Sequence, residues 1–236
     1  MSRTIVFWDI DGTLLTTGRA GMYAWQDAFE AETGIQADIL QFDSAGLPDP
    51  LIAERLLTEF GTGSNPAAAR RLLRGYELRL PENLPRREGG ALPNVREILE
   101  VLRHRPDVYS MLLTGNTRAG AKAKLSYYGL AEFFTAGAFS DGSADRAAIA
   151  HQALARAREL AGEVDAERLY VVGDTPHDVQ CAQAIGARAI AVATGRYSLA
   201  ELQGLEPWWA IEQLPEPDAF LVKLGLASVT ESEWSR

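Results

Sequence analysis

The sequence contains very little cysteine and histidine: one cysteine, Cys181, and three histidines stand among its 236 residues. A single cysteine excludes an intramolecular disulfide framework and suits a reducing compartment. His104 and His151 have no partners at the spacing that a zinc site requires. We therefore expect a cytoplasmic protein without a zinc centre.

Long apolar runs and excess positive charge are also missing. The apolar run around Val6 is far shorter than the ~20 residues that span a bilayer. Asp9 and Asp11 interrupt the N-terminal stretch, so we do not expect a signal peptide either. Lysine and arginine number 23 against 32 acidic residues, which gives a net charge of −9. Such a chain is not expected to bind nucleic acid or membranes, and its composition leaves monomer and dimer open.

What the sequence does contain is an alternation of short apolar runs with segments whose apolar residues recur at helical spacing. This alternation predicts an α/β fold, a parallel sheet covered by helices on both faces. The expected strands are Thr4–Trp8, Val108–Leu113, Thr135–Phe139, Arg168–Val172, Ala187–Ala193 and a weaker one near Trp208–Ile211. The expected helices between them are Val95–Arg103, Thr117–Tyr128, Arg146–Leu160 and Asp178–Ile185.

The segment from about residue 18 to about residue 87 departs from this alternation. Helical patterns at Tyr23–Glu32, Pro50–Phe60 and Pro66–Arg79 are separated by the breaker-rich stretches "DSAGLPDP" and "GTGSNP". The simplest interpretation is an all-α insertion after the first strand. We expect a core of residues 1–16 and 89–236 and a small helical domain of residues 17–88.

Pairs of acids follow two of the expected strands. In "FWDIDGTLL", Asp9 and Asp11 are two residues apart, which on a strand puts both side chains on one face. Two such carboxylates repel by roughly 4 kcal/mol at 4 Å and an effective dielectric near 20. In "LYVVGDTPHDVQCA", Asp174 and Asp178 are four apart at a helix start, where they could also serve as a cap and a partner of the helix dipole.

A third strand, in "MLLTGNT", ends at Thr114, followed by Gly115 and Asn116. The N–H groups of such a loop can receive anionic oxygens, although Thr-Gly-Asn is also a common turn. Ligands of parallel sheets bind beyond the carboxyl ends of the strands. If the three strand ends converge, their carboxylates need a cation, and oxygen-only ligands favour Mg²⁺.

With these motifs the chain resembles the haloacid dehalogenase superfamily, close to its phosphoglycolate phosphatase-like branch. "DIDGT" matches the first motif of that family, "TGN" the second and "GDTPHD" the fourth, and the helical insertion matches its small cap. The resemblance implies a Rossmann-like core and a Mg²⁺-dependent phosphatase. Its substrate would be a small phosphorylated metabolite, phosphoglycolate-like or a sugar phosphate, and its intermediate an aspartyl-phosphate.

The resemblance also implies a role for each matching residue. Asp9 would attack phosphorus, and Asp11 would protonate the leaving group and then activate water. Thr114 would hydrogen-bond a phosphoryl oxygen, helped by the backbone at Gly115 and Asn116. The metal ligands would be Asp9, Asp11 through its main-chain carbonyl, Asp174, and Asp178 as a ligand or the partner of one.

The third motif is the weakest match, because the family usually has a lysine there and "SDGSADRAAIAHQ" has none. Arg146 is the best-placed cation, since its guanidinium can bind phosphate through two donors. Lys122, on the helix after Thr114, is the alternative.

Other functions remain open at this point. A phosphomutase of the β-phosphoglucomutase type would share the core motifs and the cap. A 2-haloacid dehalogenase would use the same nucleophile against carbon, but such enzymes typically lack the second acid, here Asp11. An inactive relative that only binds ligands is the remaining alternative. The resemblance also implies a cap that moves about hinges near residues 16–18 and 86–91 and closes over the phosphate.

Overall fold

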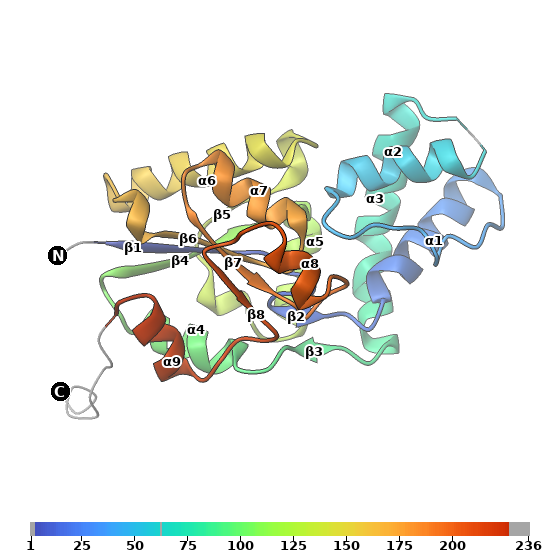
Figure 1. Ribbon diagram of the computed structural model, residues 1–236. Coiled ribbons are helices and arrows are strands. Elements are labelled where there is room, and N and C mark those ends of the chain that lie inside the picture. The colour runs from blue at the N-terminus through green and yellow to red at the C-terminus, as the bar shows by residue number, and fades with distance from the viewer. Residues whose placement is uncertain (1–2, 62, 227–236) are drawn as a thin grey trace.

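A six-stranded sheet flanked by helices forms the larger part of the molecule (Figure 1). The structure, a computed structural model, describes residues 3–61 and 63–226, so the ends of the expected core lie outside the described residues. All strand pairings in this sheet are parallel, in the order β5-β4-β1-β6-β7-β8. The strands are β1 (Thr4–Trp8), β4 (Val108–Leu113), β5 (Gly137–Ala138), β6 (Leu169–Gly173), β7 (Arg188–Val192) and β8 (Trp209–Ile211). The predicted parallel α/β fold is confirmed.

The central position of β1 follows from its composition. Every residue of this strand is buried, and alternate side chains enter two different hydrophobic clusters. Val6 and Trp8 face one cluster, where Trp8 stacks on Phe220 with ring centroids 5.8 Å apart. Ile5 and Phe7 face the other. The sheet therefore needs helices on both sides.

Two groups of helices cover the two faces. One group contributes to the cluster around Trp8: α4 (Val95–Arg103), α5 (Arg118–Tyr127) and α9 (Pro217–Lys223). The other contributes to the cluster around Phe7: α6 (Arg146–Ala161), α7 (Pro176–Ala184) and α8 (Leu199–Gln203). In Figure 1, α6 and α7 lie above the sheet and α4 and α9 lie below it.

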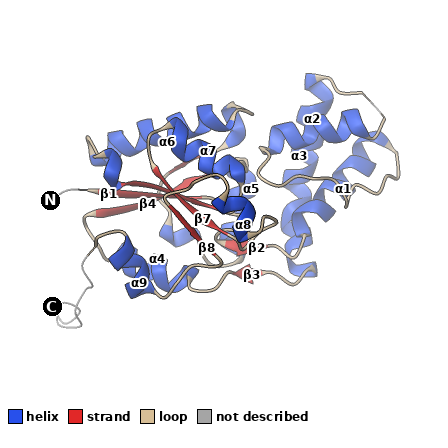
Figure 2. Cartoon of the chain, viewed as in Figure 1, coloured by secondary structure: helices blue, strands red, loops and turns tan. Residues whose placement is uncertain are grey.

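Three helices form a separate unit at one end of the sheet (Figure 2). They have a hydrophobic cluster of their own, in which Trp25 stacks on Tyr76 at a centroid distance of 4.0 Å. Asn65 caps the third helix by accepting hydrogen bonds from the N–H groups of Ala67 and Ala68. The helices are α1 (Ala20–Thr33), α2 (Asp49–Glu59) and α3 (Pro66–Asn83). We call residues 17–88 the cap; these exact bounds stay a prediction.

A small antiparallel pair that the sequence did not predict lies where the chain enters and leaves the cap. Here β2 (Leu15–Thr16) pairs with β3 (Gly90–Ala91). Each strand has only two residues, too few for a period-2 pattern to be recognised. At Gly18 the backbone has φ +55°, and a Cβ there would lie 1.9 Å from the carbonyl oxygen of Glu88. The two connections are therefore packed tightly together.

Two further details differ from the sequence expectation. The strand expected at Thr135–Phe139 is paired only at Gly137–Ala138. The helix expected from Asp178 begins at Pro176, because Thr175 and Asp178 form a capping box. Within residues 3–61 and 63–226, no helix combines the length and the apolar character needed to cross a membrane.

Candidate active site

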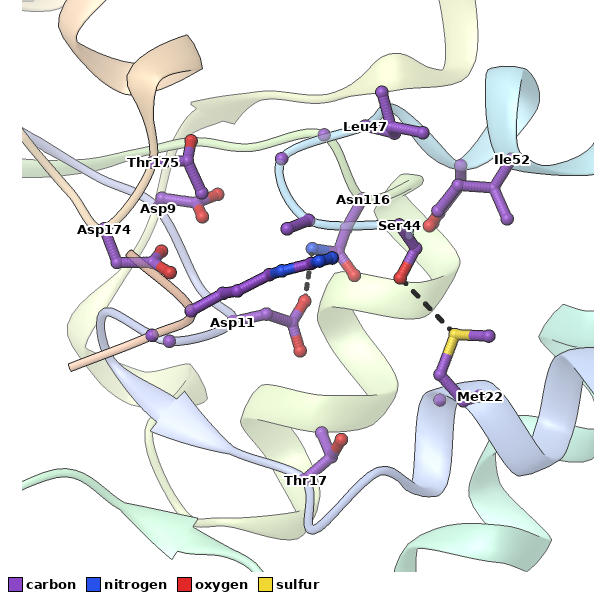
Figure 3. A pocket seen from close by; sticks show the side chains of 18 of the residues that line it. Asp9, Asp11, Thr17, Met22, Ser44, Leu47, Ile52, Asn116, Asp174 and Thr175 are labelled. Carbon is purple, nitrogen blue, oxygen red and sulfur yellow. Dashed lines mark hydrogen bonds between the residues drawn. The ribbon is translucent and has the colours of Figure 1, made fainter. Parts of the chain in front are cut away.

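A cavity of about 270 Å³ lies between the carboxyl ends of the strands and the cap. Figure 3 shows side chains from both sides pointing into it. Asp9 follows β1, Asn116 follows β4 and Asp174 follows β6, so three neighbouring strands deliver the polar groups. The opposite wall is formed by cap residues, among them Met22, Trp25, Ile52 and Tyr76.

Three acids meet at the sheet side of this cavity. Oxygen atoms of Asp9, Asp174 and Asp178 all lie within 4.8 Å of one another, and all three residues are buried. Burial, and then the charge of Asp178, raise the pKa of Asp9 to about 7. Burial, Asp178 and Asp9 together raise the pKa of Asp174 well above its ordinary range. The cluster cannot carry its full charge without compensation, and its oxygen-only donors fit Mg²⁺.

Two glycines leave the space that the Asp174 carboxylate occupies. A Cβ on Gly12, where φ is +77°, would lie 2.4 Å from Asp174 Oδ2, and a Cβ on Gly195 would lie 1.7 Å from it. Thr13 donates a hydrogen bond of 3.2 Å from its hydroxyl to Asp174 Oδ1. The position of this carboxylate is thus fixed by one donor and by two missing side chains.

Arg146 and Asp178 form a buried ion pair beside the acid cluster. The other oxygen of Asp178, Oδ2, accepts hydrogen bonds from the N–H (3.1 Å) and the hydroxyl (2.7 Å) of Thr175. Within the cluster, Asp178 therefore has fewer lone pairs left for a metal than Asp9 or Asp174. Burial lowers the pKa of Arg146, but Asp178 and Asp9 raise it by more, so the guanidinium stays charged.

The loop after β4 brings Thr114, Gly115 and Asn116 to the same place, as the second motif predicts. Thr114 is fully buried, and its hydroxyl hydrogen-bonds the Asp9 carboxylate while accepting from the N–H (3.2 Å) and Nδ2 (2.9 Å) of Asn116. Gly115 lies so close to Arg146 that a Cβ would be 3.2 Å from its Nη1. Gly115, Asn116 and Arg146 line the cavity, so a phosphoryl group there would meet backbone N–H groups and a guanidinium.

The carboxylate of Asp11 points away from the three clustered acids. It accepts a hydrogen bond of 2.9 Å from Asn116 Nδ2 (Figure 3) and one of 2.5 Å from Lys124 Nζ. Burial lowers the pKa of Lys124, but Asp11, Tyr76 and Asp49 raise it by more, so this lysine is charged. Because its carboxylate is bound by Asn116 and Lys124, Asp11 can offer a metal at the cluster only its main-chain carbonyl.

The expectation about Lys122 needs correction. Lys122 is exposed on the outer side of α5, whereas Lys124 is buried and lines the cavity. Residues two apart on a helix point in nearly opposite directions, because each residue advances the chain by about 100°. The spacing of Ala121, Lys124 and Leu125 on one helix face contains the signal that identifies the inward lysine.

Sequence reasoning also missed Asp49, at the start of α2 in the cap. Its N–H donates to the carbonyl of Gly115 (2.8 Å), and its Oδ2 accepts from the N–H of Thr117 (2.7 Å). Burial raises the pKa of Asp49 to about 7, although nearby Lys124 opposes this. The cap is thus hydrogen-bonded directly to the loop that holds Thr114. No sequence pattern indicates a contact between such distant segments.

Residues 6–183 match the model of a protein family described as haloacid dehalogenase-like hydrolase. Among solved structures, a hydrolase from Pseudomonas syringae is 22% identical with a TM-score of 0.71, covering 96% of this chain and 100% of that one. A predicted phosphoglycolate phosphatase from Haemophilus somnus 129pt is 16% identical with a TM-score of 0.74, covering 94% and 99%.

CbbY from Rhodobacter sphaeroides, in complex with phosphate, is 20% identical with a TM-score of 0.69, covering 83% and 89%. At these identities the similarity concerns the fold. A comparison with curated proteins gave no match.

Proposed function

Because the chain belongs to the haloacid dehalogenase-like hydrolase family, we propose that it is a Mg²⁺-dependent phosphatase of a small phosphorylated metabolite, phosphoglycolate-like or a sugar phosphate. The observation that carries this proposal is the cluster of Asp9, Asp174 and Asp178, buried beside Arg146 and Thr114 at the ends of adjacent strands. Such a site can both hold a divalent cation and receive a phosphoryl group.

The metal would be held by Asp9 and Asp174, with the main-chain carbonyl of Asp11 and with Asp178 as a ligand or the partner of one. When bound, Mg²⁺ supplies positive charge that neutralises the acids and draws electron density from the phosphoryl oxygens. The residues fit this ion because every available donor is an oxygen and the three carboxylates lie within 4.8 Å of one another.

In the first half-reaction, an oxygen of Asp9 attacks phosphorus. The bond from phosphorus to the ester oxygen breaks, and that oxygen takes a proton from Asp11. In the second, Asp11 removes a proton from water, whose oxygen attacks the aspartyl-phosphate. Inorganic phosphate leaves, and Asp9 is regenerated.

The other residues position the group that is transferred. The hydroxyl of Thr114 and the N–H groups of Gly115 and Asn116 would bind the phosphoryl oxygens. Arg146 would supply a fixed positive charge close to them, in the role of the family's third-motif lysine. Asp49 would seat the cap on this loop and help to exclude water. We propose that the protein acts in the cytoplasm, because its single cysteine, Cys181, is a free, buried thiol that suits a reducing compartment.

The experiment is a screen of phosphorylated metabolites with Mg²⁺ or with EDTA, read out as free phosphate and as isomerised sugar phosphate. The proposal predicts phosphate release that requires Mg²⁺ and is lost in Asp9→Asn. Isomerisation without release would support the phosphomutase alternative. Turnover of chloroacetate in EDTA would support a dehalogenase. Unchanged phosphate release by Asp9→Asn would show that the proposed site does not carry the activity.

A further inference from the structure

We propose that the leaving group of the substrate carries a second anionic group, held by Arg19 and Arg196 at the outer end of the cavity. The inference rests on the proposed phosphatase function and narrows its substrate class. Both arginines line the same cavity as Asp9 and Asp174. Arg19 comes from the start of the cap, and Arg196 comes from the loop after β7 in the core.

Arg19 has a backbone conformation that an arginine rarely adopts. It occupies the N-cap position of α1 with φ 71° and ψ 9°, and its side chain caps nothing. Asparagine, aspartate, serine or glycine would suit that position better. Its guanidinium donates to the carbonyl of Leu40 at 2.5 Å, and in the described part of the chain it forms no ion pair. Arg19 is exposed, so its charge is solvated; its unfavourable backbone conformation and its place in the cavity lining are what indicate a role in binding.

Arg196 is held over the cavity by its two neighbours in the loop. Thr194 donates a hydrogen bond of 2.6 Å from its hydroxyl to the carbonyl of Gly12, in the first-motif loop. Gly195 lies directly against the Asp174 carboxylate, where no side chain would fit. These contacts hold the backbone of the loop beside the acid cluster, and Arg196 extends from it along the cavity lining.

The two guanidinium groups bind the same stretch of chain. Arg196 forms an ion pair with Asp43, and Arg19 binds the carbonyl of Leu40, three residues earlier. Three residues of extended chain span at most about 11 Å between Cα atoms, and both arginines line the same cavity of about 270 Å³. The ion pair with Asp43 also shows that the Arg196 guanidinium can bind a carboxylate in this position. This ion pair is exposed on both sides, and exposed pairs contribute little stability, so an incoming anion can replace Asp43.

Most of the other cap residues at the cavity are apolar, and the hydroxyl groups there belong to Thr17, Ser44 and Tyr76. Met22, Trp25 and Ile52 are apolar, and the hydroxyl of Ser44 is turned to the sulfur of Met22 at 3.4 Å (Figure 3). A volume of about 270 Å³ suits a phosphoryl group with a leaving group of a few carbon atoms. A carboxylate or a second phosphoryl group would meet both arginines.

The test compares substrates matched in size and differing in charge. Phosphoglycolate is paired with 2-hydroxyethyl phosphate, and propane-1,3-diol bisphosphate with 3-hydroxypropyl phosphate. The two pairs separate a carboxylate from a second phosphoryl group. For at least one pair, kcat/KM for the charged substrate should exceed that for the neutral one by about tenfold or more, mainly through KM.

Variants identify the residues responsible. Arg19→Gln and Arg196→Gln should each reduce the charged-to-neutral ratio of kcat/KM by about tenfold, and Arg196→Lys should restore part of it. Asp43→Asn should keep or raise the ratio, because it frees Arg196. If the Arg196–Asp43 pair were only structural, Asp43→Asn and Arg196→Gln would instead change both substrates alike. Arg70→Gln, an exposed arginine of α3 outside this cavity, is the matched control.

The outcomes separate a failure of this inference from a failure of the proposed phosphatase function on which it rests. Equal kcat/KM for charged and neutral substrates, or a ratio that neither arginine variant lowers, would overturn the inference. Mg²⁺-dependent hydrolysis of p-nitrophenyl phosphate would leave the proposed phosphatase function standing in that case. Absence of hydrolysis of every phosphomonoester, this one included, would contradict both.

Discussion

Lys124 Nζ lies 2.5 Å from Oδ2 of Asp11, and the same ammonium group lies 2.6 Å from Oδ1 of Asn116. The Lys124 side chain is only 5% exposed. Asp49 and Tyr76, both from the cap, also raise the pKa of this lysine. One buried cation therefore connects the first-motif loop, the second-motif loop and the cap.

Replacing this lysine should cost considerable stability. Lys124→Met leaves Asp11 without its ion-pair partner and removes a cation that lowers the pKa of buried Asp49, so we expect the free energy of unfolding to fall by about 3 kcal/mol. Lys122→Met, on the exposed side of the same helix, should change it by less than about 0.5 kcal/mol. Urea unfolding of the two variants measures the difference. Equal effects would show that Lys124 is not a buried link between these loops and the cap.

Two substitutions of Arg146, one that removes the charge and one that keeps it, should differ in their effect on stability and activity. Arg146→Met leaves a buried carboxylate unpaired, so we expect a loss of about 3–5 kcal/mol in the free energy of unfolding and a large loss of phosphate release. Arg146→Lys keeps the charge and should recover a substantial part of both. Urea unfolding and phosphate-release rates report the result. A lysine variant as impaired as the methionine variant would mean that charge at this position is not what matters.

Gly195 should be essential for binding the metal. Gly195→Ala puts a methyl group where Asp174 Oδ2 now lies, so the carboxylate has to move. We expect Mg²⁺ affinity, measured by calorimetry, to fall about tenfold or more. Gly142→Ala is the control, since a Cβ there meets nothing within 4 Å. Unchanged affinity in Gly195→Ala would argue that Asp174 is not a ligand.

The raised pKa values of Asp9 and Asp174 predict a specific pH dependence without metal. The folded protein keeps protons that the unfolded chain has released, so stability should fall as the pH rises from about 4 to about 7. Mg²⁺ favours the ionised carboxylates, so it should raise the melting temperature more at about pH 8 than at about pH 5.

Asp174→Asn provides the control for this prediction. It removes one buried charge, so the metal-free variant should be more stable than the wild type at about pH 8, and its response to Mg²⁺ should be lost. A full Mg²⁺ response in this variant, or a wild-type response independent of pH, would contradict a metal bound by these acids.

The parallel sheet and its acidic edge could be predicted because local signals determine them. Four of the five residues of Thr4–Trp8 are apolar, as is typical of a central parallel strand, and Asp9 and Asp174 follow strands that are adjacent in the sheet. The resemblance to the haloacid dehalogenase superfamily then assigns a role to each of these motifs. What connects sheet and cap could not be predicted in this way. Asp49 and Lys124 are 75 positions apart, and no periodicity links them.

The choice of lysine shows a different kind of error. The expectation for Lys122 rests on its place on the helix after Thr114, whereas the face of that helix decides which side chain reaches the cavity. Periodicity around Ala121 and Leu125 identifies Lys124. The position of Arg19 near the entry to the cap can be read from the sequence, but its positive φ cannot, because it depends on how the chain turns into the cap.

The central claim is that Asp9 accepts the phosphoryl group, and rapid acid quenching during turnover with Mg²⁺ tests it most directly. Mass spectrometry of the digested protein should find the peptide that contains Asp9 heavier by one phosphoryl group in the wild type and unchanged in Asp9→Asn. The substrate should yield phosphate only in the wild type. Phosphate release at the wild-type rate by Asp9→Asn, or a phosphorylated peptide elsewhere in the chain, would contradict the account.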